Sequence, residues 1–314
     1  MIFHNTKIEL CAETGTGCRR MKEMDENTLM EEKIIKLYKK WKGGRIKNAL
    51  SAVVFYFLMM IIVSIFFGNP FSHRETLLFF EVWEPGWIST RPYLLVLCGG
   101  AAIFLTLFMV CYKILKSFKE FDDILQQQCD PKQYLEVISY GVSYGKELRL
   151  KGYQKSVFQL MQQRYALALM VNAQLEESRR FLNEGWIGKK KAGIYKNTVF
   201  NLDLVEAYQQ QDVERYSELY NRAGRSFKKN RLFGVQKLFL EHQYKQAADI
   251  LEGYKVKTAY NNVIRSQLLG QCYDNLGDRK RAEECMRYVL EYGNTMPARA
   301  KAEKWLTHNR EQLV

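Results

Sequence analysis

The residues that could carry chemistry in this chain are its histidines, its cysteines and its paired acids. His242 and His308 have no cysteine, serine or acidic partner at a recognisable catalytic spacing. The acidic pairs at 122–123 and 283–284 lie in charged segments and are typical of solvated helix faces. The chain is therefore expected to have no enzymatic activity and to bind no cofactor.

Two short patterns near the N-terminus are too incomplete to predict a metal site or a phosphate loop. Cys11 and Cys18 are seven residues apart, whereas zinc sites use cysteine pairs separated by roughly two to four residues. The Gly15-Thr-Gly17 sequence lacks the further glycine and the lysine of a phosphate-binding loop. We expect no metal site, and we interpret the two cysteines as unrelated thiols.

Two long apolar segments are the first structural elements that the sequence predicts. Residues 49–67 and 93–112 contain no charged side chain. A helix needs about 20 apolar residues to cross the hydrocarbon core of a bilayer. Both segments are therefore predicted to be transmembrane helices, which makes the chain an integral membrane protein with two spans. Their lack of ionisable residues is typical of an anchor rather than of a transport pathway.

Basic residues around the two segments indicate how the chain crosses the membrane. Six Lys or Arg precede the first segment closely and three follow the second, but the connection, residues 68–92, contains only Arg74 and Arg91. Cytoplasmic flanks of membrane helices are enriched in these residues. Both termini are therefore expected in the cytoplasm. The external connection is rich in aromatic residues, which favours a segment at the membrane interface or a docking surface for a partner.

The N-terminal segment, residues 1–48, is expected to be cytosolic and basic. A charged run compatible with a helix begins at Met21, so translation could start at Met1 or at Met21. Each lysine close to an anionic membrane gains roughly 1 kcal/mol. The residues predicted to contact anionic lipid headgroups, or only to fix the topology, are Lys36, Lys39, Lys40, Lys42, Arg45 and Lys47.

The rest of the chain is predicted to be helical. No proline occurs between Pro131 and Pro297, and such a stretch permits an all-α domain because proline breaks helix interiors. Asp130 followed by proline is a favourable helix start, since Asp caps the first free amides. We expect a juxtamembrane helical region over residues 113–156 and a helical domain over residues 157–314.

Residues 262–292 contain two helical patterns joined by a turn. Glycine on one helix opposite alanine on the next allows a close crossing, and larger side chains fill the space around it. The residues expected to pack the helices or make the turn are Leu269, Gly270, Tyr273, Gly277, Ala282 and Met286. This pattern resembles a tetratricopeptide repeat, with Leu-Gly-x-x-Tyr on the first helix, Gly-Asp at the turn and Ala on the second helix.

Earlier segments repeat the second half of this pattern more weakly. Ala247 and Leu251 occur 35 residues before their counterparts in the last hairpin, close to the family period of about 34 residues. Two further hairpins carry Ser178 and Tyr216 at the position of the alanine. The irregular spacings and the large tyrosine depart from the family pattern, so an irregular helical bundle remains the alternative.

The resemblance implies an α-solenoid whose groove binds a protein or peptide. On this basis the chain is expected to be a membrane-anchored scaffold of bacterial type, with the segment after Pro297 capping the open end of the array. Phe239 could equally be a core residue. The residues expected to face the groove are Gln236, Phe239, Gln267, Gln271 and Asp274.

Two other classes of function remain open from the sequence. The net charge is +13, and basic runs occur at residues 189–191 and 222–231. Such runs neutralise nucleic-acid phosphates or attract a domain to anionic lipid. We favour lipid, because the chain is expected to be in a membrane, and consider nucleic acid the weaker alternative. A signalling role would need a bistable element, and no sequence feature indicates one.

Overall fold

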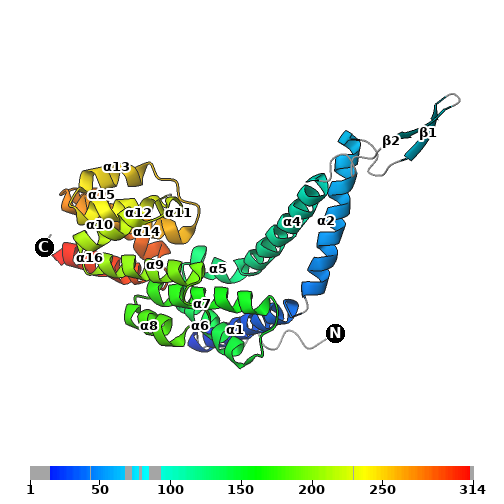
Figure 1. The fold of residues 1–314 in the computed structure, drawn as a ribbon. Coiled ribbons are helices and arrows are strands. Elements are labelled where there is room, and N and C mark those ends of the chain that lie inside the picture. The colour runs from blue at the N-terminus through cyan, green and yellow to red at the C-terminus, as the bar shows by residue number, and fades with distance from the viewer. Residues whose placement is uncertain are drawn as a thin grey trace, which may run out of the picture. The chain divides into compact units, whose positions relative to one another are not determined.

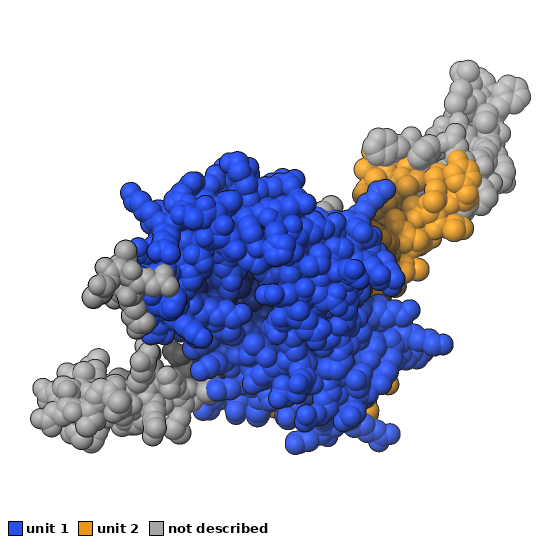
Figure 2. Space-filling view, turned by 90° about the vertical axis from the view of Figure 1, so that its left-hand side faces the viewer, with its two compact units in different colours: residues 1–36, 120–149, 158–314 blue, residues 37–119, 150–157 orange. Residues whose placement is uncertain are grey.

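The computed structural model describes residues 15–42, 44–67, 73–77, 80–84, 93–228 and 230–311. Within these ranges the chain is helical apart from one pair of strands (Figure 1). The helical fold class is therefore confirmed. The chain divides into two compact units, which Figure 2 shows in different colours. Residues 1–36, 120–149 and 158–314 make the first unit, and residues 37–119 and 150–157 make the second.

Helix α1, Gly15–Lys40, covers most of the predicted N-terminal segment. It begins before Met21, so the helix extends further toward the N-terminus than the charged run indicates. The Gly15-Thr-Gly17 sequence is the first turn of this helix and not a phosphate loop. Met1 and Cys11 lie outside the described residues.

Helices α2, Gly44–Phe67, and α4, Tyr93–Ser117, pack against each other in the second unit. A Cβ atom on Gly99 of α4 would lie 3.9 Å from the ring of Tyr56 on α2. Every fourth residue of α4 is buried, which places one stripe of the helix inward. The stripe consists of Leu94, Cys98, Ala102, Thr106, Val110 and Ile114. Small residues in the middle of this stripe, Cys98, Ala102 and Thr106, allow another helix to approach closely.

Strands β1, His73–Leu77, and β2, Phe80–Glu84, lie in the connection between these two helices. They form an antiparallel pair whose register places Arg74 opposite Trp83. Among the described residues these strands are the one departure from the all-α prediction. The side chains of the connection lie outside the described residues, so its predicted place at the membrane interface stays a prediction.

Most of the first unit is a succession of helices joined by tight turns (Figure 1). A π-helical turn, Phe181–Gly185, follows the fourth of them, α8. The helices are α5 (Lys119–Gln126), α6 (Pro131–Glu147), α7 (Gln154–Val171), α8 (Leu175–Arg180), α9 (Gly193–Gln209), α10 (Val213–Arg222), α11 (Arg225–Lys228), α12 (Arg231–Leu240), α13 (Tyr244–Glu252), α14 (Ala259–Asn275), α15 (Arg279–Tyr292) and α16 (Pro297–Glu311).

Four of the turns share one backbone geometry. Each contains a residue with positive φ: Ala173, Gln211, His242 or Gly277. The amide of the following residue donates to the carbonyl five residues earlier, over 2.9 Å in all four turns. This is the hydrogen bond of a Schellman motif, which ends a helix and reverses the chain. The chain therefore builds the same hairpin four times, although the spacing between the turns varies.

The second helix of each of these hairpins buries its first inward residue completely. That residue comes five positions after the turn residue with positive φ. The four side chains, all 0% exposed, are Ser178, Tyr216, Ala247 and Ala282. Three of them are small, as close helix crossing requires, but at the fourth the large ring of Tyr216 fills the same position.

The residues predicted to pack the last hairpins lie where that packing occurs. Five of them share one buried cluster: Ala247, Leu251, Leu269, Tyr273 and Ala282. Met286 belongs to a second cluster, which the last helix, α16, covers with Leu306. Gly270 is buried, and Gly277 has a φ of 78°, a conformation that glycine adopts without steric cost.

A further hairpin, formed by α5 and α6, precedes the four. Its turn contains Cys129 with positive φ, and Tyr134 is buried five residues later. The Tyr134 hydroxyl donates to Asp122 over 3.2 Å, and Arg164 binds both oxygens of the same carboxylate over 2.7 and 2.8 Å. Residues 120–149 therefore pack with the later hairpins, so the predicted region 113–156 is divided between the two units.

Candidate functional site

The first unit contains a pocket of about 600 Å³ at an edge formed by hairpin turns. Three successive turns contribute to it, together with the end of α14 and one residue of α16. The lining residues are Ala173, Tyr208, Gln209, Gln211, Val213, Phe239, Leu240, His242, Tyr244, Gln271, Asn275 and Lys301. Residues more than 120 positions apart in sequence thus converge on one surface.

The turn geometry places polar side chains at the pocket. Gln211 and His242 adopt positive φ, a conformation that costs most residues roughly 1 kcal/mol or more relative to glycine. The turn of Gly277, which has the same geometry, does not line the pocket. At the pocket three residues with side chains, Ala173, Gln211 and His242, therefore have positive φ, and Cys129 and Asn294 have it elsewhere. Such backbone strain is typical of functional positions.

Aromatic rings and amide groups dominate the pocket. The rings of Phe239 and Tyr244 meet edge to face at 5.3 Å, and the Tyr244 hydroxyl lies 2.6 Å from Nδ1 of His242. Burial raises the pKa of the Tyr208 phenol, so this group stays neutral. Among the lining residues described, Lys301 carries the only full charge at neutral pH. Asn and Gln amides both donate and accept, as a peptide backbone does.

The structure brings two of the five predicted groove residues into this pocket, Phe239 and Gln271. Gln236 instead accepts a hydrogen bond from the Tyr216 hydroxyl over 3.0 Å. Asp274 accepts one from Nε1 of Trp305 on α16, also over 3.0 Å. These two side chains therefore bind elements of the same unit. Gln267 is partly buried and does not line the pocket.

Sequence reasoning missed most of the pocket. The turn residues Gln211 and His242 carry a usable signal, because each stands where glycine or asparagine is preferred at a helix end. Tyr208 is three positions before such a turn and could have been found with it. No sequence signal indicates Lys301, since only the packing of α16 brings it to the pocket.

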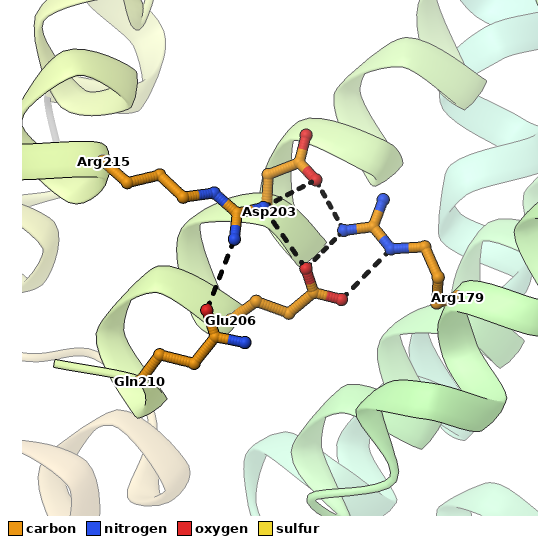
Figure 3. A network of polar contacts seen from close by, with 5 residues as sticks. All are labelled: Arg179, Asp203, Glu206, Gln210 and Arg215. Atoms are coloured by element: carbon orange, nitrogen blue, oxygen red, sulfur yellow. Dashed lines mark hydrogen bonds and ion pairs between the residues drawn. The ribbon is translucent and has the colours of Figure 1, made fainter. Parts of the chain in front are cut away.

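An ionic cluster holds the helix that carries Tyr208 (Figure 3). Arg179 of α8 binds Asp203 over 2.5 Å and Glu206 over 2.6 Å, both on α9. Arg215 of α10 approaches Glu206 to 3.5 Å from the other side. Burial disfavours the charged guanidinium, but the hydrogen bonds that Arg179 donates to Glu206 and Asp203 outweigh it and raise the pKa of Arg179. Both carboxylates form ion pairs with arginines. The cluster therefore positions α9 and does not supply a catalytic acid or base.

Two neighbouring thiols of the core are not nucleophiles at neutral pH. Burial, with a smaller effect of Cys285, raises the pKa of Cys272 to about 12. Burial also raises the pKa of Cys285 to about 11. The thiolate is the reactive form of cysteine, and both groups stay protonated. Among the described residues no three His, Cys, Asp or Glu side chains are grouped to hold a metal ion.

The second unit presents apolar side chains outward. Helix α4 is long and apolar enough to cross a membrane, by its length and composition. On α2 the apolar stretch with described side chains is Leu50–Val63, which is shorter than a full span. Val96 and Phe104 on α4 and Ile65 on α2 are more than two-thirds exposed. Large exposed apolar surfaces mark contacts with a membrane or a protein.

The basic residues predicted to contact lipid lie at the end of α1 and the start of α2. Ile34 and Tyr38 on α1 and Trp41 just after it are buried, whereas the lysines between and after them are exposed. The exposed lysines are Lys36, Lys39, Lys40 and Lys42. Lys36 forms an ion pair with Glu32 at 3.3 Å. The side chains of Arg45 and Lys47 lie outside the described residues.

Comparisons with known proteins found no relative of this chain. No protein-family model, no curated protein and no solved structure matches the chain.

Proposed function

We propose that the chain is a non-catalytic, membrane-anchored scaffold whose helical unit binds a protein or peptide segment in the pocket at the hairpin turns. The observation that carries this proposal is the pair of strained polar turn residues, Gln211 and His242, which converge on one pocket. Strain of this kind persists only where the surrounding structure holds it, and it is found most often at active sites and ligand-binding sites.

The repeated hairpin supports assignment of the helical unit to a tetratricopeptide-like α-solenoid. Four turns of equal geometry and four completely buried residues at one position are what a repeat array needs, since each repeat packs on its neighbours. The varied spacing and the position of Tyr216 describe a degenerate array. Protein or peptide binding is then the expected use of the unit.

The chemistry of the pocket favours an extended peptide segment of neutral or acidic character. Side-chain amides match the donors and acceptors of a peptide backbone, and the rings of Phe239 and Tyr244 suit an apolar side chain. Lys301 favours a carboxylate and disfavours a lysine or arginine of the ligand.

We propose two membrane spans, residues 49–67 and 93–112, with both termini in the cytoplasm. The support is the outward apolar surface of α2 and α4 and the excess of basic residues beside them. A reporter that fluoresces only in the cytoplasm should be bright when fused after Val314. A dark fusion protein of full length would contradict this orientation.

Photocrosslinking in cells tests the pocket as the binding site. A photoreactive amino acid at Gln271, inside the pocket, is expected to capture one discrete protein. The matched control is the same amino acid at Gln246, an exposed glutamine of α13 that does not line the pocket. Charge reversal by Lys301→Glu should reduce the captured amount if the ligand is acidic. No adduct at position 271, or the same adduct at position 246, would contradict the proposal.

A further inference from the structure

The segment after the π-helical turn combines an exposed apolar side chain with a run of lysines. Ile187 is 52% exposed, and Lys189, Lys190 and Lys191 are all exposed. The residue before them, Trp186, is buried. A single exposed isoleucine is ordinary on a protein surface. Ile187 differs from such residues in two ways: its backbone is fixed by a buried side chain, and three lysines follow it closely in the sequence.

A buried glutamine fixes the backbone of Ile187. Gln162 of α7 is 0% exposed, and its amide makes two hydrogen bonds to this one residue. Its Oε1 accepts from the Ile187 amide over 2.6 Å, and its Nε2 donates to the Ile187 carbonyl over 2.9 Å. A buried side-chain amide needs hydrogen-bond partners, so burying Gln162 without this segment would lower the stability of the fold. The backbone of Ile187 is therefore held in place while its side chain faces solvent.

The aromatic residues around the segment complete its support. The Trp186 ring packs edge to face on Phe181 at 6.4 Å and on Tyr195 at 5.3 Å. Gly188 then adopts a φ of 139°, which turns the chain toward the lysines. The segment is built to present one aliphatic side chain next to three positive charges.

The lysines of this segment are more available than the second basic run. Among the described residues Lys189 and Lys191 form no ion pair, and Lys190 donates to the Asn183 carbonyl over 2.7 Å. In the other run, Arg222 pairs with Glu218 at 3.3 Å. Lys228 and Arg231 of that run lie over tyrosine rings, at 5.7 and 5.9 Å.

We propose that residues 186–191 form a contact site for an anionic lipid bilayer. Lys189, Lys190 and Lys191 bind headgroup phosphates, and Ile187 enters the boundary between headgroups and acyl chains. Each lysine near an anionic surface favours binding roughly fivefold, and a buried aliphatic side chain adds to it. This contact goes beyond the proposed function, since it requires nothing of the pocket at the hairpin turns.

Lipid fits these observations better than nucleic acid. Proteins that bind single-stranded nucleic acid combine basic residues with exposed aromatic rings on which the bases stack. Here the aromatic residue, Trp186, is buried and the exposed residue is aliphatic. An isoleucine gains nothing from a sugar-phosphate backbone but gains apolar contact from acyl chains.

The test uses the full-length chain reconstituted into vesicles, with a photoreactive amino acid at Ile187. We expect a covalent lipid adduct in vesicles that contain phosphatidylglycerol, with a yield about tenfold or more above that in pure phosphatidylcholine. Replacing all three lysines by glutamine should lower the yield by a similar factor, and high salt should do the same. The matched control is the photoreactive residue at Tyr292, which is 49% exposed and follows Glu291.

Any of the following results would overturn the proposal. One is the absence of a lipid adduct at position 187 in anionic vesicles. Another is an equal yield at position 187 in neutral and anionic vesicles, or an equal yield at position 292. The third is a loss of the lipid adduct in favour of an RNA adduct when RNA is added, which would assign the segment to nucleic acid. Circular dichroism of the lysine variant should show unchanged helix, since these side chains are exposed.

Discussion

Replacing Tyr216 with alanine is expected to lower the free energy of unfolding by about 3–5 kcal/mol, the range for deleting a buried aromatic side chain. The result runs against the proposed repeat pattern, in which alanine is expected at this position. Tyr216 is 0% exposed and packs with Leu204, Ala207 and Leu240. Its hydroxyl also donates to the Phe233 carbonyl over 3.0 Å. Alanine would leave a cavity where the hairpins have been spaced for a large ring.

The Tyr216→Phe variant is the control for this prediction. It keeps the ring and removes only the hydroxyl, so we expect a loss of about 1 kcal/mol from the missing hydrogen bonds. Urea unfolding of the full-length chain in detergent, followed by circular dichroism, would measure both variants. Equal stability of the two variants would mean that the ring does not support the spacing of the hairpins.

Replacing Ala282 with leucine is expected to cost about 1–3 kcal/mol, the usual penalty for overpacking a core. Ala282 is 0% exposed in the last of the four hairpins. Helix α14 approaches so closely there that a Cβ atom on Gly270 would lie 3.4 Å from the Ala282 carbonyl and 3.1 Å from the Met286 side chain. Three further carbon atoms on residue 282 have no room in this crossing.

The same change at Ala300 is the matched control. Ala300 is exposed on α16, so Ala300→Leu should change the free energy of unfolding by less than about 0.5 kcal/mol. Both variants can be measured in one series with those of Tyr216. A core variant as stable as the exposed one would contradict close packing of the last hairpin.

These two predictions concern opposite solutions to one packing problem. Where the first inward residue of the second helix is alanine, as at Ala247 and Ala282, a small side chain fills this position. Where it is Tyr216, a large buried ring does so. The succession of hairpins therefore combines small and large side chains at the same position.

The pocket and the lysine segment have separate supports in the fold. Strained turn residues and α9, held by Arg179, build the pocket. Gln162 of α7 and the aromatic residues around Trp186 build the lysine segment. Because the two sites share no side chain, the loss of one by mutation should leave the other intact. A scaffold with both could hold a partner while it stays in contact with a bilayer.

The sequence by itself determined the helices, the apolar segments and the turns. These features depend on interactions between residues a few positions apart, so their signals are local. The Schellman bonds close over five residues, and Asp212 and Asp278 cap the helix that follows within three residues. The residues that pack the last hairpins could be predicted for the same reason, since they repeat at helical spacing.

Only the tertiary structure decided which of these residues meet. Lys301 and Ala173 line the same pocket although they are 128 positions apart. Trp305 donates a hydrogen bond to Asp274, which is 31 positions away. Gln162 likewise finds Ile187 through the fold. The stacking of the hairpins sets these encounters, and side-chain volumes such as that of Tyr216 set the stacking. The effect of one side-chain volume depends on all the helices packed around it, and no local sequence pattern records those contacts.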